Sequence, residues 1–180
     1  IELSKLLGNS QRTLEHVINF EAEVAILAHV PADRRVQMVP YRSHRVVVFV
    51  NHEHPWFKRK SVKMRELADQ PFVLRERGST TRRAFEAAML EDGLEMKPVF
   101  EIESREGVWK AVEQGLGISV VADFEFVAHP NLHALEIKDR VIRTEYSIAF
   151  LKDRAHSPII KAFMDTVGQM TKQTPIGIRG

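Results

Sequence analysis

The chain has 180 residues, of which 44% are hydrophobic and 28% are charged. This composition supports one large domain or two small ones with a real core, and it excludes disordered, collagen-like and low-complexity classes. The formal net charge of +2 is too small for a protein that binds polyanions by bulk attraction. The absence of cysteine excludes disulfides, thiolate nucleophiles and cysteine metal sites, which fits a reducing compartment.

The start of the chain and its apolar runs indicate where the protein is expected to be located. The chain begins at Ile1 without a basic segment, apolar stretch and cleavage site, so we expect a trimmed segment of a longer protein. The apolar run Val46–Val50 is far shorter than the roughly 18 residues of a membrane helix. We therefore expect a soluble, cytoplasmic domain with no membrane partner.

The first part of the chain mixes short β-branched runs with amphipathic stretches, which predicts an α/β fold. Residues 36 to 50 read as two strands, antiparallel around a turn at residues 41 to 44, and residues 51 to 60 read as a polar loop. The other expected elements are a strand over 1–7, a helix capped by Ser10, a strand over 24–27, and a helix over 62–69 capped by Ser61.

From residue 71 the alternation is cleaner. Strands over 71–74, 99–103 and 118–121 are separated by two helices, the first stopped by Asp92-Gly93 and the second by Gly115. Such a βαβαβ pattern predicts a parallel sheet. The last third is expected to hold a helix over 123–128, strands over 132–137 and 145–151, and a helix that starts at Ser157-Pro158.

The sequence shows little evidence of a catalytic or metal-binding site. Gly-x-Ser-x-Gly and Ser-x-x-Lys patterns with their partners are missing, so we expect no enzyme. His52 and His54 flank a glutamate, and His129 precedes His133 by four residues, but loop geometry and a proline make solvated histidines the better interpretation than a metal site. Gly115-Leu-Gly117 ends a helix instead of opening one, so no dinucleotide cofactor is expected.

The segment from Arg75 to Arg83 carries the strongest functional pattern. A strand ends, Gly78 lets the backbone turn, and three hydroxyl residues, Ser79, Thr80 and Thr81, fall where the N–H groups of a helix start are unpaired. Helix N–H groups, the helix dipole and the arginines, Arg75 and Arg82 among them, can together bind a carboxylate or phosphonate. The simpler alternative is that Ser79 or Thr80 only caps the helix.

Ser104 repeats this geometry at the next junction between a strand and a helix. Ligands of open parallel sheets collect at the carboxyl ends of the strands, so both junctions are expected to border one crevice. An ordinary N-cap is the alternative for Ser104. Trp109 is more often a core or interface residue, and we leave it outside the predicted site.

Taken in order, these segments resemble the effector-binding domain of LysR-type transcriptional regulators over nearly the whole chain. The segments that carry the resemblance are Gly8–Leu14, Glu23–Ile26, Val46–Val50 with His54-Pro55, Leu67–Leu74, Glu76–Arg82, Glu103–Val108 and Gly115–Ile118. The resemblance implies a periplasmic-binding-protein-like (type 2) fold of two α/β lobes joined by two crossover strands, with a small effector between them. We expect lobe I over residues 1–70 plus 141–180 and lobe II over residues 71–140.

The same resemblance implies site residues and partners. Residues 78 to 82 and Ser104 fall on the cleft side of lobe II, and the matching loop of lobe I nominates Ala28 and His29. A small anionic effector is expected because of the helix N-termini and arginines. Operator DNA would be bound only through a helix-turn-helix absent from this chain, and the intact protein is expected to be a homo-oligomer. The family's first strand and helix are also expected to lie upstream of Ile1, which leaves lobe I incomplete.

Two other readings share the lobed fold. A solute-binding protein of a transporter would carry a secretory signal upstream, whereas a regulator would carry a helix-turn-helix. An enzyme would need a base that converges on the cleft, and His29 is the only candidate in the sequence.

Overall fold

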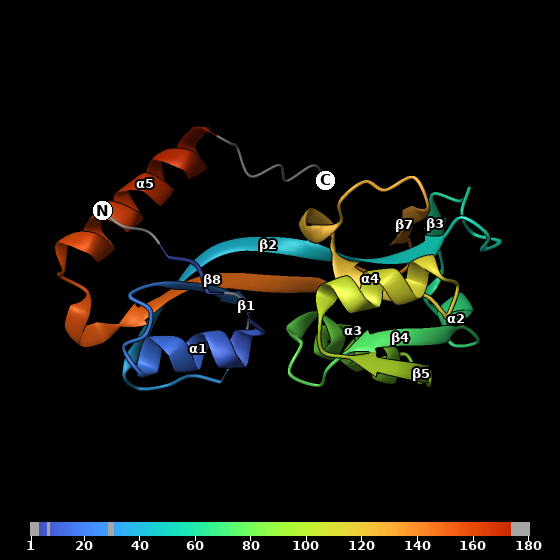
Figure 1. The fold of residues 1–180 in the computed structure, drawn as a ribbon, viewed down its shortest axis with the longest axis horizontal. Coiled ribbons are helices and arrows are strands. Elements are labelled where there is room, and N and C mark those ends of the chain that lie inside the picture. Colours follow the sequence, from blue (N-terminus) through green and yellow to red (C-terminus); the bar gives the residue numbers. More distant parts are fainter. Residues whose placement is uncertain (1–3, 7, 29–30, 174–180) are drawn as a thin grey trace. The chain divides into compact units, whose positions relative to one another are not determined.

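The computed structural model describes residues 4–6, 8–28 and 31–173 (Figure 1). It divides into two compact units, unit 1 with Ile1–Tyr41 and Ser147–Gly180, and unit 2 with Arg42–Tyr146. Both units combine helices and strands, which confirms the α/β class. The expected lobe boundaries near residues 70 and 141 differ from this division, which groups residues 42–70 and 141–146 with unit 2.

Unit 1 contains α1 (Ser10–Ile18), β1 (Ala25–Ala28), the 3-10 turn η2 (Lys152–Arg154), α5 (Pro158–Gln173) and parts of two long strands. Leu14 and Val17 of α1 pack in a buried cluster with Leu27 and Ala149. The expectation that Ser10 caps α1 is wrong, because the Asn9 side chain accepts the Arg12 N–H at 3.0 Å. The expected strand over 1–7 falls partly outside the described residues, and residues 4–6 are not in a strand.

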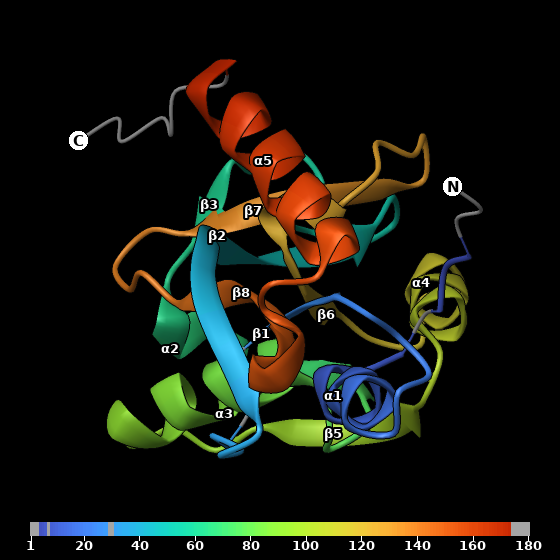
Figure 2. The same cartoon turned by 90° about the vertical axis from the view of Figure 1, so that its left-hand side faces the viewer.

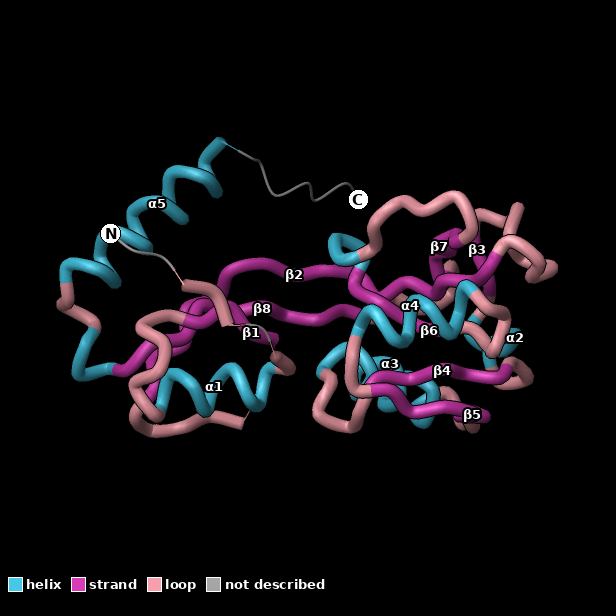
Figure 3. Tube along the Cα trace, in the orientation of Figure 1, coloured by secondary structure: helices cyan, strands magenta, loops and turns pink. Residues whose placement is uncertain are grey.

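The two long strands are β2 (Val36–Asn51) and β8 (Arg143–Leu151), and each contributes residues to both units (Figure 3). The expectation of two antiparallel strands between residues 36 and 50 is wrong, because β2 runs through without a turn. Residues 41 to 44 contain no glycine or asparagine to supply a left-handed position, and the fixed φ of Pro40 suits extended backbone. The division between the two units falls within these strands, and the expected lobe boundaries near residues 70 and 141 stay a prediction.

Unit 2 holds the remaining elements. These are β3 (Ser61–Val62), α2 (Met64–Leu67), β4 (Pro71–Arg75), α3 (Thr80–Glu91), β5 (Lys97–Ile102), α4 (Arg105–Glu113), β6 (Ser119–Ala122), the 3-10 turn η1 (Asp123–Glu125) and β7 (Leu132–Ile137). Two expectations are wrong here: Ser61 lies in β3, which pairs with β7, and the helix expected over 123–128 is only the short turn η1. The helix expected over 62–69 is reduced to α2.

The predicted βαβαβ segment is confirmed. β4 pairs in parallel with β5, and Phe72 forms a parallel bridge with Ile118, directly before β6. β6 and β7 both pair antiparallel with β2. Glycine is required at Gly117, because a Cβ there would lie 2.5 Å from the carbonyl oxygen of Pro71.

Helices α3 and α4 cover opposite faces of this sheet (Figure 2). Alternation along the strands produces the two faces: Phe72 and Leu74 pack with α3, whereas Val73 between them packs with α4. Because β4 and β5 run parallel, the helices that follow them, α3 and α4, both begin at the same end of the strands. Among the described residues, no helix combines the length and the apolar character needed to cross a membrane.

Candidate functional site

Three junctions meet at the carboxyl edge of the parallel strands in unit 2. The parallel register pairs Arg75 with Ile102, so the chain leaves β4 and β5 side by side. β6 runs in the same direction and ends at Ala122. α3, α4 and η1 begin at these three strand ends, and we call this region the strand-end edge. It is the position at which open α/β sheets bind ligands.

At the first junction Ser79 caps α3. Its side chain accepts the Arg82 N–H at 3.4 Å, and a turn closed by Ser79 N–H to the carbonyl of Glu76 (2.9 Å) contains Gly78. The N–H groups of Thr80 and Thr81 precede the first intrahelical bond, so the helix itself gives them no acceptor. The cap therefore coexists with two N–H donors that the helix itself does not satisfy.

The arginines of this junction are occupied by the protein. The guanidinium of Arg82 is buried and donates to Glu86 (2.7 Å), to Glu101 (2.7 Å) and to the carbonyl of Arg75 (2.5 Å). The side chain of Arg75 forms a two-bond ion pair with Glu76 at 2.8 and 3.1 Å. Neither guanidinium therefore has a pair of N–H donors left to bind a carboxylate ligand through two hydrogen bonds. This argues against the direct effector contacts expected for these two residues.

Ser104 caps α4 in the same way, accepting the N–H of Gly107 at 3.0 Å. A Cβ at position 107 would lie 2.7 Å from both the Ser104 hydroxyl and the Ile102 side chain, so glycine allows this tight start. Ser104 is exposed, whereas Ser79 is buried. The structure thus places the two predicted serines at adjacent strand ends.

The third junction was missed by the sequence reasoning. Asp123 accepts from His44 (3.0 Å), and the Phe124 ring lies 3.9 Å from the His44 ring and 5.3 Å from that of Tyr146. Burial is the main reason that the pKa of Tyr146 rises to about 12, helped by the nearby Glu125 carboxylate. Because His44 and Tyr146 come from β2 and β8, only the sheet pairing, and no local pattern, brings them to η1.

In unit 1 the predicted loop follows β1. Ala28 is buried, and its N–H donates to the Ser10 hydroxyl at 3.0 Å, so that donor is already used. His29 lies outside the described residues. The roles expected of these two residues stay predictions.

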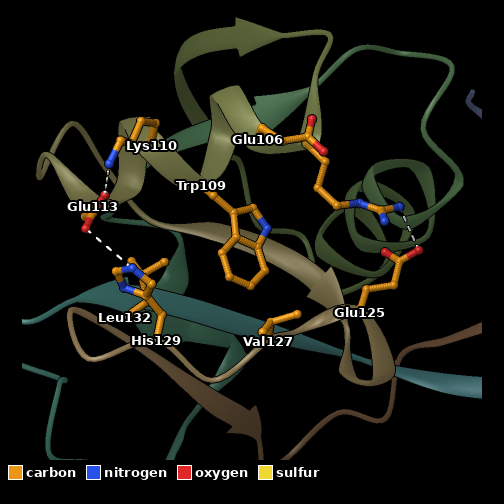
Figure 4. Close-up of a pocket in the computed structure, with 9 residues that line it drawn as sticks. Glu106, Trp109, Lys110, Glu113, Glu125, Val127, His129 and Leu132 are labelled. Atoms are coloured by element: carbon orange, nitrogen blue, oxygen red, sulfur yellow. Dashed lines mark hydrogen bonds and ion pairs between the residues drawn. The ribbon is translucent and has the colours of Figure 1, made fainter. Parts of the chain in front are cut away.

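A cavity of about 440 Å³ opens along the outer face of α4, with Trp109 at its centre (Figure 4). None of the residues nominated from the sequence lines it, and Trp109, expected to be a core or interface residue, was left outside the predicted site. Among the described residues, no group of three or more potential ligands could hold a metal ion.

Residues 1–172 match the family model of the LysR substrate binding domain. The chain belongs to this family. Among curated relatives, the HTH-type transcriptional activator CmpR of Synechocystis sp. is 28% identical, with 92% of this chain and 55% of the relative covered. The RuBisCO operon transcriptional regulator of Acidithiobacillus ferrooxidans is 29% identical, with 88% and 52% covered. This LysR domain therefore spans about half the length of these relatives.

Solved structures agree on the fold. The effector binding domain of QuiR in complex with shikimate has a TM-score of 0.83 at 23% identity, covering 92% of this chain and 79% of that one. The regulatory domain of CcmR from Synechocystis in complex with 2-PG has a TM-score of 0.80 at 25% identity, covering 92% and 81%. The predicted two-lobed, periplasmic-binding-protein-like fold of a LysR effector-binding domain is confirmed.

Proposed function

We propose that this LysR domain binds a small anionic metabolite at the strand-end edge of unit 2 and does not transform it chemically. The supporting observation is the parallel pairing of β4 and β5, which brings the starts of α3 and α4 to neighbouring strand ends. Each start carries a capping serine and donor N–H groups, and helix dipoles add partial positive charge. A domain of similar fold, 25% identical, was solved with 2-PG.

The ion pairs of the site refine the expected chemistry. Since Arg75 and Arg82 are neutralised by carboxylates, the anion is held by backbone N–H groups and hydroxyls rather than by those guanidinium groups. Recognition of this kind depends on geometry more than on net charge, which suits a chain whose formal net charge is only +2.

In the intact protein, we propose that effector binding changes how a helix-turn-helix segment, supplied outside this chain, engages operator DNA, in a homo-oligomer located in the cytoplasm. The relatives named as transcriptional regulators support this role over that of a transporter's solute-binding protein or an enzyme. A ligand can shift such an equilibrium only by its difference in affinity for the two states.

The experiment removes one donor while keeping the helix. Thr80 is the first residue of α3, and Ser79 before it is extended (φ −69°, ψ 121°), so Thr80→Pro fits the backbone and deletes the N–H and the hydroxyl. Thr80→Ala is the matched control that deletes only the hydroxyl. Calorimetry with 2-PG, inorganic phosphate and a panel of carboxylates, against glycerol as the neutral probe, is expected to show anion binding that Thr80→Pro weakens by about tenfold, as for a charge-assisted bond.

Two results would overturn the proposal: a heat of binding with neutral or cationic compounds only, or an anion affinity that is unchanged in Thr80→Pro.

A second experiment tests the regulatory role. It uses the full-length regulator and measures its affinity for operator DNA with and without the anion that binds most tightly. Equal DNA affinity and equal footprints in the two conditions would contradict the regulatory role while leaving the binding site in place.

A further inference from the structure

The cavity on the outer face of α4 has a chemical character opposite to that of the strand-end edge. It lies between α4 and the segment that follows η1, entirely within unit 2, and its volume of about 440 Å³ is in the range of small-molecule sites. Ser79 and Ser104 do not line it. Figure 4 shows charged side chains arranged around the indole of Trp109.

Trp109 forms a rigid aromatic platform. Its ring stacks on Phe126 at 5.3 Å with a 27° interplanar angle and contacts Phe49 at 5.6 Å. Trp109 remains only partly buried, and Val127 and Leu132 add apolar surface to the same cavity. Within the described chain, no acceptor contacts the indole N–H. A partly exposed indole ring held in place by other aromatic rings is a surface on which an organic cation can stack.

The charges around the platform favour a cation. Arg105 is paired with Glu125 at 2.8 Å, and Lys110 is paired with Glu113 at 2.7 Å. Glu106 also lines the cavity, and within the part of the chain that the structure describes it has no hydrogen-bond or ion-pair partner. With both basic side chains matched, the cavity has one carboxylate in excess.

The neighbouring Glu113 is fixed as a carboxylate. Hydrogen bonds from Lys110 and then from Asn131 lower its pKa, and His129 lies 3.8 Å from it. Glu113 and its partner Lys110 therefore compensate each other, and the excess negative charge of the cavity lies at Glu106.

We infer that this cavity is a second binding site, which takes a small organic cation, an amine or guanidine carrying an apolar group, with the apolar group on Trp109 and the cation beside Glu106. The inference does not depend on the anion site. The two sites use different groups, backbone N–H donors at the edge and side chains in the cavity, and they prefer opposite charges, so either can fail alone.

The test compares three probes of similar size: phenethylammonium, neutral 2-phenylethanol and anionic 3-phenylpropionate. Calorimetry is expected to rank them in that order, with the ammonium at least about fivefold tighter than the alcohol, as an ion pair with Glu106 and a cation–π contact with Trp109 together would give. Glu106→Gln is expected to remove that preference. Glu103→Gln is the matched control, because Glu103 is an exposed carboxylate just before α4 that does not line the cavity.

Fluorescence locates the binding event. The chain has two tryptophans, and Trp56 is buried in the core cluster on the α3 side, so Trp56→Phe leaves Trp109 as the only indole. Phenethylammonium is expected to change the Trp109 emission, and Thr80→Pro is expected to leave this titration unchanged. Equal affinity for the three probes, tighter binding of the propionate, no binding of any probe, or an unchanged preference in Glu106→Gln would each overturn the inference.

Discussion

Arg82 offers a sharp test of whether the strand-end edge uses its guanidinium for structure or for ligands. Arg82→Met keeps most of the stem and removes the charge. In the structure the side chain is 8% exposed and donates to Glu86, Glu101 and the carbonyl of Arg75. Hydrogen bonds to charged groups contribute about 1.5–3 kcal/mol each, but water can re-solvate half-exposed carboxylates. We therefore expect a loss of about 2–3 kcal/mol in the free energy of unfolding, or roughly 5–10 °C in the melting temperature.

The pH dependence of this loss has a definite sign. The hydrogen bond from Arg82 lowers the pKa of the Glu101 carboxyl. A lowered pKa in the folded state means that the stabilisation is present above the unfolded value, about 4.3 for glutamate, and is lost as the pH falls through the folded value. Urea unfolding at neutral pH and at about pH 3 should thus show a smaller difference for Arg82→Met than for the wild type.

Arg83→Met, which changes the exposed neighbouring residue, is the control for the loss of one positive charge. The structural interpretation predicts that Arg82→Met lowers stability and leaves anion affinity within about twofold. If Arg82→Met kept full stability and lost anion binding by tenfold or more, Arg82 would be an effector ligand and the reasoning from its ion pairs would be refuted.

Three further predictions concern packing and titration. Gly117→Ala should lower the free energy of unfolding in urea by about 3 kcal/mol, because the new Cβ would meet the Pro71 carbonyl. Gly93→Ala should lower it by only about 1 kcal/mol, because Gly93 has a φ of +68° but open space around it. Equal losses in the two variants would contradict the steric argument. Two hydrogen bonds from Arg59 lower the pKa of Glu66 to about 2. Glu66→Gln should therefore flatten the decline of the melting temperature between pH 5 and pH 2. An unchanged slope would contradict this role of the ion pair. Tyr146→Phe should abolish an ultraviolet titration step near pH 12, because burial raises the pKa of this phenol to about 12. If the variant instead lost a titration step near pH 10, the burial of the phenol would be contradicted.

Features set by short-range sequence could be predicted. Ser79 and Ser104 each cap a helix because a hydroxyl three residues before an N–H reaches it within one turn, and Gly93 ends α3 with a positive φ. The parallel order of β4 and β5 follows from the helix between them. These local rules were enough to place both serines at one edge of the sheet.

Features set by distant partners could not be predicted. The residues from 41 to 44 predict a turn, but β2, which pairs with β8, runs through them without a break. Arg82 looked available for an anion until β5 brought Glu101 to it from 19 positions away in the chain. Burial of charge requires a partner, and the sequence gives no sign of which carboxylate the fold will supply.

Helix α4 borders both proposed sites, which prefer ligands of opposite charge. Its first turn presents N–H donors and the positive end of the helix dipole at the strand-end edge, beside Ser104. Its outer face presents side chains, and there Glu106 decides the charge of the cavity. Glu106 lies in the first turn of α4, where its carboxylate offsets the positive end of the helix dipole. The proposed anion site uses backbone N–H donors and the proposed cation site uses side chains, so the two ligands would not compete for the same groups.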